Sequence, residues 1–225
     1  MTSIESEKSI NIIKQIATKD NSITFYNNKY KEHYHSTTGA KEEVLKKFVN
    51  PCKHLFNKNK LNVLDICFGL GYNSAGLIDT VLNVNPNCNI NIIGLENDIN
   101  ILNKIKDVNI DFRNYKIIKQ FKINTSITLN NITLKIILGD ARQTIKSLKT
   151  EFDIILLDPF SPKQCPELWT LDFFKEIFNK MNIGGVLTTY SCARIVRYNL
   201  KQAGFIVKDG PKVERRGPST IAIKK

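Results

Sequence analysis

The chain has 225 residues, of which 42% are hydrophobic and 24% charged, so it is long enough for one globular domain with a sizeable core. Its net charge of +12 favours a polyanionic partner such as nucleic acid, although a general richness in Lys, Asn and Ile could also leave solvated lysines without a partner. No apolar run approaches the roughly 18–20 residues of a membrane span, and residues 1–19 lack the apolar core of a signal peptide, so we expect a cytoplasmic protein with no membrane partner.

Residues 1–60 are less regular than the rest and are expected to form an N-terminal extension that caps a cofactor and substrate site. Within them, residues 23–26 are predicted to form a strand and residues 41–49 a helix. Tyrosines and histidines gather between residues 26 and 35, ahead of Gly39. The histidines are too close together, and too poor in neighbouring acids, for a convincing metal site.

From Leu61 onward strands and helices alternate, which predicts a parallel sheet with helices on both faces over residues 61–225. The first unit is a strand over residues 62–66, a turn containing Gly69 and Gly71, and a helix over residues 72–82. A second strand over residues 89–95 ends at Glu96. A helix reaching about residue 108 should follow, because short oxygen-bearing side chains such as those of Asn97 and Asp98 suit a helix N-cap.

The second half begins with a predicted hairpin, residues 126–129 and 132–138 around two asparagines, which tolerate the positive φ of tight turns. A helix over residues 142–148 leads to an apolar strand over residues 152–157. Helices over residues 171–181 and 193–203 flank a strand over residues 186–190, and Gly204 is a suitable terminator for the last helix. Residues 205–208 and 220–223 are predicted to close the sheet as an antiparallel edge.

The five cysteines are odd in number, widely spaced and free of any Cys-x-x-Cys pair. This spacing favours neither a zinc site nor a disulfide framework. We expect free, reduced thiols in or near the core and no metal.

Acidic residues stand at the ends of four predicted strands: Asp65, Glu96, Asp140 and Asp158. Ligands of open α/β sheets bind at the carboxyl ends of the strands, so the four acids are expected to face one crevice. Glycines in the first turn let a ligand approach the backbone, and Glu96 is placed to accept both hydroxyls of a ribose. Helix capping would explain one or two of these acids but not all four.

The nucleoside cofactor is predicted to be S-adenosylmethionine. A dinucleotide loop would carry a third glycine where this chain has Ser74, and Asp65 would place negative charge beside the phosphates. That same charge suits the sulfonium and ammonium groups of S-adenosylmethionine. The predicted cofactor-binding residues are Asp65, Phe68, Gly69, Gly71, Asn73, Glu96, Asn97, Asp140 and Ala141.

The segment that follows the strand over residues 152–157 carries the predicted chemistry. Asp158 ends an apolar run and is followed by Pro159 and Phe160 in a proline-stiffened turn. A carboxylate in this place can hold an amino group by hydrogen bonds while a ring packs against the carrier of that group. We therefore predict nitrogen chemistry with Asp158 and Phe160 as catalytic residues, core packing being the alternative for Phe160.

Three segments resemble one family in order and spacing. They are Phe68-Gly69-Leu70-Gly71-Tyr72-Asn73, Leu157-Asp158-Pro159-Phe160-Ser161-Pro162 and Pro166-Glu167-Leu168-Trp169-Thr170, and residues 39–43 are similar as well. The family is the methyltransferase component of the tRNA 5-methylaminomethyl-2-thiouridine biosynthesis protein. The resemblance runs from about Tyr26 to the C-terminus.

The resemblance implies a class I S-adenosylmethionine-dependent methyltransferase fold, Rossmann-like, with a mostly parallel sheet and an antiparallel last strand. It implies transfer of a methyl group to the aminomethyl nitrogen of a wobble uridine, which converts 5-aminomethyl-2-thiouridine to 5-methylaminomethyl-2-thiouridine in the anticodon region of a tRNA. Glu96 would bind the ribose, Asp140 the adenine side and Asp158 the substrate amine. The oxidase half of the family's bifunctional members is expected to be absent.

The chain departs from the family where Cys67 and Pro159 replace glycines. Cys67 is expected to narrow the methionine pocket, and Pro159 to stiffen the loop. The predicted substrate-binding residues are Pro159, Trp169, Arg194, Arg197, Arg215 and Arg216. Arg194, Arg197 and Lys201 share one helix face. The alternative to tRNA binding by this face is an ordinary solvated surface. For Trp169 the alternative to substrate binding is a structural role.

Two other kinds of function stay open. One is a small-molecule amine methyltransferase or a polyamine aminopropyltransferase, which shares the strand-end acids but gives no reason for the charge of +12. The other is a non-catalytic RNA-binding module that has kept the fold and should bind no S-adenosylmethionine.

Overall fold

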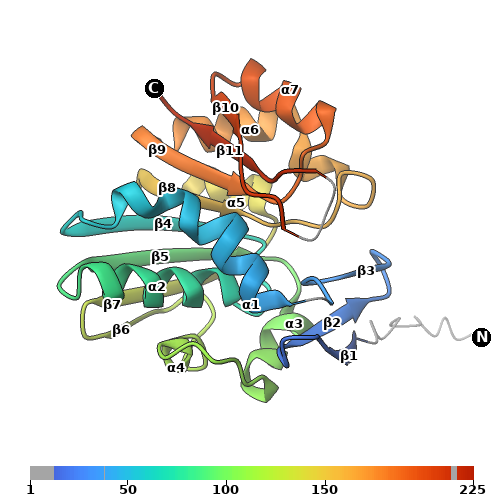
Figure 1. Cartoon of the computed structure of the whole chain (residues 1–225), viewed down its shortest axis with the longest axis vertical. Helices are drawn as coiled ribbons and strands as arrows, with labels where there is room; N and C mark the ends of the chain where they lie inside the picture. The colour runs from blue at the N-terminus through green and yellow to red at the C-terminus, as the bar shows by residue number, and fades with distance from the viewer. Residues whose placement is uncertain (1–12, 38, 214–216) are drawn as a thin grey trace, which may run out of the picture.

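The computed structural model describes residues 13–37, 39–213 and 217–225. The first described segment forms a small antiparallel sheet in the order β1-β2-β3, made of β1 (Ile13–Ala17), β2 (Ile23–Asn27) and β3 (Glu32–His33). It lies beside one end of the main sheet (Figure 1). The strand predicted over residues 23–26 is thereby confirmed as β2.

An eight-stranded sheet forms the centre of the molecule, in the order β10-β11-β9-β8-β4-β5-β7-β6 (Figure 1). The five middle strands pair in parallel, and β6, β11 and β10 are antiparallel to their neighbours. The predicted fold, a mostly parallel sheet with an antiparallel closing edge, is confirmed. The strands are β4 (Lys60–Ile66), β5 (Asn89–Glu96), β6 (Ser126–Leu129), β7 (Ile132–Leu138), β8 (Phe152–Leu157), β9 (Met181–Thr189), β10 (Ile206–Asp209) and β11 (Thr220–Ile223).

Helices cover both faces of this sheet. The helical elements are α1 (Ala40–Glu43), the π-helix η1 (Val44–Val49), the 3-10 helix η2 (Asn50–Leu55), α2 (Tyr72–Val84), α3 (Ile99–Lys104), η3 (Ile105–Asp107), α4 (Tyr115–Ile118), α5 (Ala141–Ser147), η4 (Pro166–Trp169), α6 (Leu171–Asn179) and α7 (Arg194–Gln202). Residues of η1, α2 and α4 pack on one face, and residues of α5, α6 and α7 on the other.

Strand β4 shows why the central strands carry apolar residues on both faces. Leu61 and Val63 point into the core on the α2 side, whereas Leu64 and Ile66 point into the core on the α6 side. Because side chains alternate between faces, a strand that is covered on both sides must be apolar at both sets of positions.

Several boundaries differ from the sequence-based expectation. The helix predicted over residues 41–49 consists of one α-turn followed by a π-helix. A 3-10 helix that begins at Asn50 and carries Pro51 in its first turn comes next. The helix predicted over residues 171–181 ends at Asn179, so β9 already begins at Met181 and runs through Gly184 and Gly185. A proline inside a helix removes one backbone hydrogen bond, which accounts for the change of helix type near residue 50.

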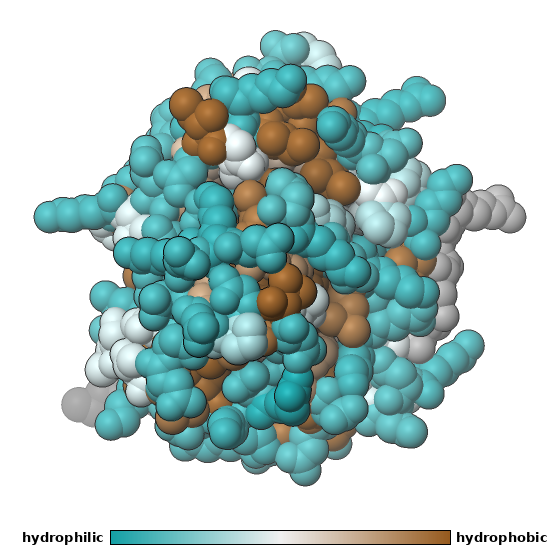
Figure 2. All heavy atoms as spheres, turned by 60° about the vertical axis from the view of Figure 1, so that its left-hand side comes forward, coloured by the Kyte–Doolittle hydropathy of each residue, from teal (hydrophilic) through white to brown (hydrophobic). Residues whose placement is uncertain are grey.

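The face seen in Figure 2 is largely polar. In the view of Figure 2 hydrophilic side chains cover most of the molecule, and hydrophobic atoms form small separate groups. Scattered groups of this size are ordinary on a globular protein. None of the helices in the described ranges is long and apolar enough to cross a bilayer.

Candidate active site

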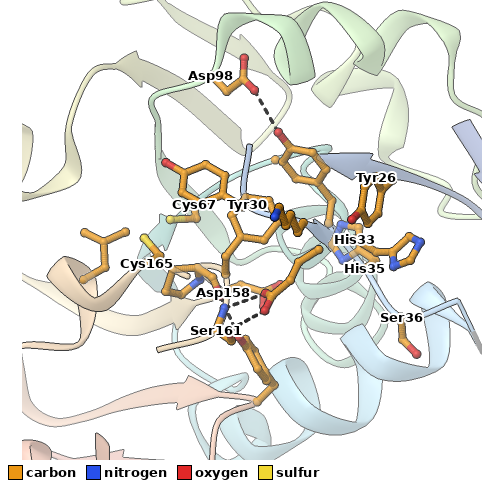
Figure 3. A pocket seen from close by; sticks show the side chains of 18 of the residues that line it. Tyr26, Tyr30, His33, His35, Ser36, Cys67, Asp98, Asp158, Ser161 and Cys165 are labelled. Carbon is orange, nitrogen blue, oxygen red and sulfur yellow. Dashed lines mark hydrogen bonds between the residues drawn. The ribbon is translucent and has the colours of Figure 1, made fainter. Parts of the chain in front are cut away.

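Two adjoining cavities open at the carboxyl ends of β4, β5 and β8. The larger, of about 440 Å³, lies between these strand ends and the β2–β3 region of the N-terminal sheet (Figure 3). The smaller, of about 220 Å³, extends to the start of α5. The junction of the two cavities is marked by the residues that line both of them: Tyr30, Cys67, Glu96, Asn97 and Leu168.

The turn after β4 brings backbone close to this junction. Cys67, Gly69 and Gly71 all have positive φ, of 64°, 54° and 74°. A Cβ on Gly71 would lie 2.7 Å from the Phe68 ring and from Ile118, so glycine is required there by conformation and by space. Cys67 therefore adopts the left-handed backbone conformation, which costs residues with a Cβ roughly 1–2 kcal/mol. Glycine would adopt this conformation with less strain.

Glu96, at the end of β5, is fixed by backbone amides. Its Oε2 accepts from Gly69 N at 2.9 Å, and its Oε1 accepts from Asn97 N and Asp98 N at 2.8 and 2.9 Å. Burial raises the pKa of Glu96, and these hydrogen bonds oppose that shift. Three of the roughly four acceptor positions of the carboxylate are occupied, which leaves room for a ligand hydroxyl at the junction of the cavities.

Asp140 and Ala141 line the smaller cavity, where the start of α5 forms its wall. Asp140 is the N-cap of that helix, and it also accepts hydrogen bonds from the guanidinium of Arg142. These hydrogen bonds lower the pKa of Asp140. Asp140 therefore caps helix α5, which was the alternative to ligand binding, and it also forms part of the cavity wall.

Asp158 follows β8 and lines the larger cavity, half-buried, opposite the N-terminal sheet (Figure 3). Asn73 Nδ2 donates to its Oδ2 at 2.9 Å. The same cavity is walled by aromatic rings, among them those of Tyr26, Tyr34 and Phe160. A carboxylate beside aromatic faces is a favourable environment for a cationic or amine group.

Several predicted site residues lie elsewhere. The expectation that Asp65 faces the crevice is wrong, because its side chain is fully buried, accepts a hydrogen bond from Ser74 Oγ at 2.6 Å and lines neither cavity. Burial raises its pKa well above the ordinary value. Phe68 also lines neither cavity, since its ring packs in the core against Gly71 and Gly94.

Trp169, predicted to bind the substrate, lines neither cavity. The indole is buried against Phe174 and Tyr190, and its Nε1 donates to the carbonyl of Phe160 at 2.9 Å. Its role is structural, as the alternative interpretation held. Pro159 is buried but lines the larger cavity beside Asp158.

The predicted basic face is only partly available. Arg194 is exposed on α7, but the guanidinium of Arg197 donates to Thr220 Oγ1, Asp209 Oδ1 and the carbonyl of Ser219. Arg197 thus ties α7 to the closing strands and is not free to bind a substrate phosphate. Arg215 and Arg216 lie outside the described residues.

The N-terminal sheet contributes residues that the sequence interpretation did not assign. Glu32 of β3 and the adjacent Tyr34 line the larger cavity, and the Tyr34 hydroxyl donates to Asp98 Oδ2 at 3.0 Å (Figure 3). Glu43, at the end of α1, lines the same cavity. The cluster of aromatic residues before Gly39 was the available signal. Its histidines are unsuited to a metal site by spacing, and no group of three or more His, Cys, Asp or Glu side chains among the described residues could hold a metal ion.

His35 should make the fold sensitive to acid. The imidazole is buried, stacks on Tyr72 with 4.8 Å between ring centroids, and has no hydrogen-bond partner for Nε2. Burial lowers its pKa from 6.5 to about 4, against the opposing charge of Glu43. Between these values the unfolded chain takes up a proton that the native state does not, so we expect about 2–3 kcal/mol of stability to be lost as the pH falls from 7 to 4.5.

Denaturant unfolding of His35→Phe at both pH values tests this expectation. Phenylalanine keeps a ring against Tyr72 but does not titrate, so the variant should lose less stability in acid than the wild type does. His54→Phe, at an exposed position, is the matched control and should follow the wild type. Equal acid sensitivity of His35→Phe and wild type would contradict the expected role of His35.

Comparison with known proteins places this chain in a family. A family model described as S-adenosyl-L-methionine-dependent methyltransferase matches residues 106–225, more than half of the chain. The chain belongs to this methyltransferase family. The crystal structure of MNMC2 from Aquifex aeolicus is 33% identical and superposes with a TM-score of 0.85 over 97% of this chain and 72% of that one.

Other relatives of this methyltransferase are longer proteins. An uncharacterized protein of Methanocaldococcus jannaschii is 31% identical over 216 residues, 93% of this chain and 59% of that protein. The tRNA 5-methylaminomethyl-2-thiouridine biosynthesis bifunctional protein MnmC of Campylobacter concisus is 39% identical over 97 residues, 42% of this chain and 16% of that protein. Spermidine synthase from Thermotoga maritima, at 14% identity and a TM-score of 0.65, shares the fold.

The cofactor of the family, S-adenosylmethionine, fits the residues present. Glu96, at the junction of the cavities, has an acceptor position left for a ribose hydroxyl, and Asp140 and Ala141 wall the space beyond it. The larger cavity next to Gly69 contains the carboxylate of Asp158 and several aromatic rings, which suits a sulfonium cation. The assignment of individual cofactor-binding residues, Asn97 included, stays a prediction.

Proposed function

We propose that this methyltransferase transfers a methyl group from S-adenosylmethionine to the aminomethyl nitrogen of a modified wobble uridine in tRNA. The observation that carries the proposal is Asp158, an acid that follows the central strand β8 and lines an aromatic cavity next to the Gly69 turn. The similarity to MnmC proteins and the net charge of +12 support a tRNA substrate. A tRNA substrate in turn favours a cytoplasmic location.

S-adenosylmethionine, when bound, supplies an electrophilic methyl group on a sulfonium centre. The residues of the chain then have to position the acceptor, because an in-line displacement depends chiefly on alignment. An alkylammonium has no free lone pair, so it must release a proton, to Asp158 or to solvent in the open cavity, before the neutral amine reacts. Asp158 accepts a hydrogen bond from the amine, orients its lone pair and stabilises the positive charge that develops on nitrogen.

The N-terminal segment supports the proposal as a cap over the site. Residues 26–37 supply much of the wall of the larger cavity, and the remainder comes largely from the strand ends of the domain that follows. We propose that residues 1–60 cap the cofactor and substrate and that residues 61–225 form the methyltransferase domain. Exposed Arg194 and Lys201 on α7 offer positive charge to the phosphate backbone of the tRNA.

The test is incubation of the protein with isotopically labelled S-adenosylmethionine and tRNA that carries 5-aminomethyl-2-thiouridine, followed by nucleoside mass analysis. We expect one labelled methyl group on the side-chain nitrogen of the wobble nucleoside. Transfer to a free polyamine or another small amine, with unchanged tRNA, would favour the small-molecule alternative. Failure to bind S-adenosylmethionine would favour a non-catalytic RNA-binding module.

A further inference from the structure

The loop from Asp158 to Ser161 is held on one side by the domain that carries it. Asn73 donates to Asp158, and the Tyr190 hydroxyl donates to the carbonyl of Pro159 at 3.0 Å. The Trp169 indole donates to the carbonyl of Phe160 at 2.9 Å. These hydrogen bonds fix the first three residues of the loop.

The N-terminal sheet holds the other side of the loop. The carboxylate of Glu32, in β3, accepts one hydrogen bond from Ser161 N at 2.9 Å and a second from Ser161 Oγ (Figure 3). The ring of Phe160 stacks on Tyr30 with 4.6 Å between centroids, and it meets Tyr34 edge-on at 5.1 Å. Residues 129 positions apart in sequence are thus joined by two hydrogen bonds to one carboxylate.

The same sheet is also tied to the strand end that carries Glu96. Tyr34 donates from its hydroxyl to Asp98, and the Asn27 side chain donates to that hydroxyl at 2.8 Å. Burial, with the nearby charge of Asp98, raises the pKa of Tyr34, so its hydroxyl stays protonated and donates at neutral pH. The N-terminal sheet therefore bridges the Glu96–Asp98 turn and the Asp158–Ser161 loop across the larger cavity.

We infer that Glu32 is a positioning residue, through which the N-terminal sheet fixes the Asp158–Ser161 loop against the acceptor. The inference rests on the proposed function, in which Asp158 holds the acceptor amine. A carboxylate that accepts both the amide and the hydroxyl of Ser161 restrains the position and the rotation of the loop. Misplacement of a catalytic group by about 1 Å can lower the rate roughly a hundredfold.

Glu32 also lines the cavity, so it could instead take the amine proton itself. Glu32→Gln separates the two roles. The glutamine carbonyl still accepts from Ser161 N, and the Ser161 hydroxyl can turn to accept from the new amide. A positioning role is therefore largely kept in Glu32→Gln, whereas a proton-accepting role is lost.

The kinetic experiment compares Glu32→Ala, Glu32→Gln and the control Glu42→Ala, which removes a carboxylate paired with Lys46 on the exposed side of the same N-terminal region. We expect Glu32→Ala to lower kcat at least about tenfold, with the KM for tRNA and the affinity for S-adenosylmethionine changed by less than about twofold. Glu32→Gln should keep kcat within about threefold of wild type, and Glu42→Ala should match wild type.

A second readout needs no methyl transfer. Trp169 is the only tryptophan in the chain, and its indole donates a hydrogen bond to the carbonyl of Phe160 in the loop. Release of the Ser161 end should therefore make Trp169 more accessible to acrylamide and shift its emission to longer wavelength in Glu32→Ala, but not in Glu32→Gln. Unfolding midpoints of both variants show whether the change is local, and Ser161→Ala, which loses one of the two hydrogen bonds, should give a smaller change in the same direction.

Each outcome decides the inference. Equal loss of kcat in Glu32→Gln and Glu32→Ala would overturn it in favour of direct proton transfer, especially if one limb of the pH–rate profile disappears. Unchanged Trp169 fluorescence in both Glu32→Ala and Ser161→Ala would overturn it as well. If wild-type protein leaves tRNA unmethylated, the proposed function fails, while the fluorescence still decides whether Glu32 holds the loop.

Discussion

Replacing Asp158 by asparagine should lower the rate of methyl transfer by about a hundredfold or more while cofactor affinity stays within about twofold. The substitution keeps the size of the side chain, and an amide oxygen can still accept from Asn73, so the loop should hold its place. The negative charge that orients the amine and stabilises the developing positive charge is lost. Asp158→Ala should be at least as damaging.

Single-turnover rates with saturating cofactor, together with S-adenosylhomocysteine affinity by calorimetry, check this expectation. Asp172→Asn is the matched control, because Asp172 is an exposed acid in the first turn of α6. Near-normal turnover in Asp158→Asn would show that the charge of Asp158 is not used. Loss of cofactor affinity parallel to the loss of rate would instead make Asp158 a cofactor-binding residue.

Replacing Lys47 by methionine should destabilise the fold by about 3–5 kcal/mol. Lys47 Nζ lies 2.6 Å from Glu43 Oε1, and the two side chains are only 5% and 11% exposed. Methionine fills a similar volume but leaves the Glu43 carboxylate buried without a cation. An uncompensated buried charge is costly because little water is left to solvate it.

The adjacent pair Lys46–Glu42 provides the control, since it has the same spacing but side chains that are 53% and 42% exposed. Lys46→Met should cost no more than about 1 kcal/mol. Lys47→Met combined with Glu43→Gln should recover much of the lost stability, because glutamine can still accept from Ser36 N. Equal effects of Lys46→Met and Lys47→Met on the free energy of unfolding would show that burial of the Lys47–Glu43 pair does not make Lys47 more important for stability.

The pH dependence of Lys47→Met follows from the same pair. Burial raises the pKa of Glu43, but Lys47 and its hydrogen bond outweigh burial and the net pKa lies below the ordinary 4.5. The pair therefore stabilises wild type above pH 4.5 and ceases to do so as the pH falls through the lowered pKa. Without Lys47 the carboxyl is protonated more readily in the native state, so the stability difference between wild type and variant should shrink in acid.

Local patterns were sufficient to predict most of the main sheet. The largely apolar strands β4 and β8, the hairpin of β6 and β7, and the acids Glu96 and Asp158 at strand ends are all visible within short windows of sequence, from runs of apolar residues and from turn chemistry. Parallel topology then brings the strand ends together, because every crossover returns the chain to the same edge. Glu96, Asp140 and Asp158 accordingly line the cavities as expected.

Tertiary structure alone decided which candidates reach the site. Asp65, near the end of β4, and Phe68, in the turn that follows, stand at the expected strand end. Their side chains are nevertheless buried and line neither cavity, and Trp169 faces Phe174 rather than a ligand. Glu32 and Tyr34 carry no motif, but the packing of the N-terminal sheet places them against Ser161 and Asp98. Such contacts join residues 64 to 129 positions apart, and no local propensity encodes them, because they exist only once the sheet edge and its cap have packed.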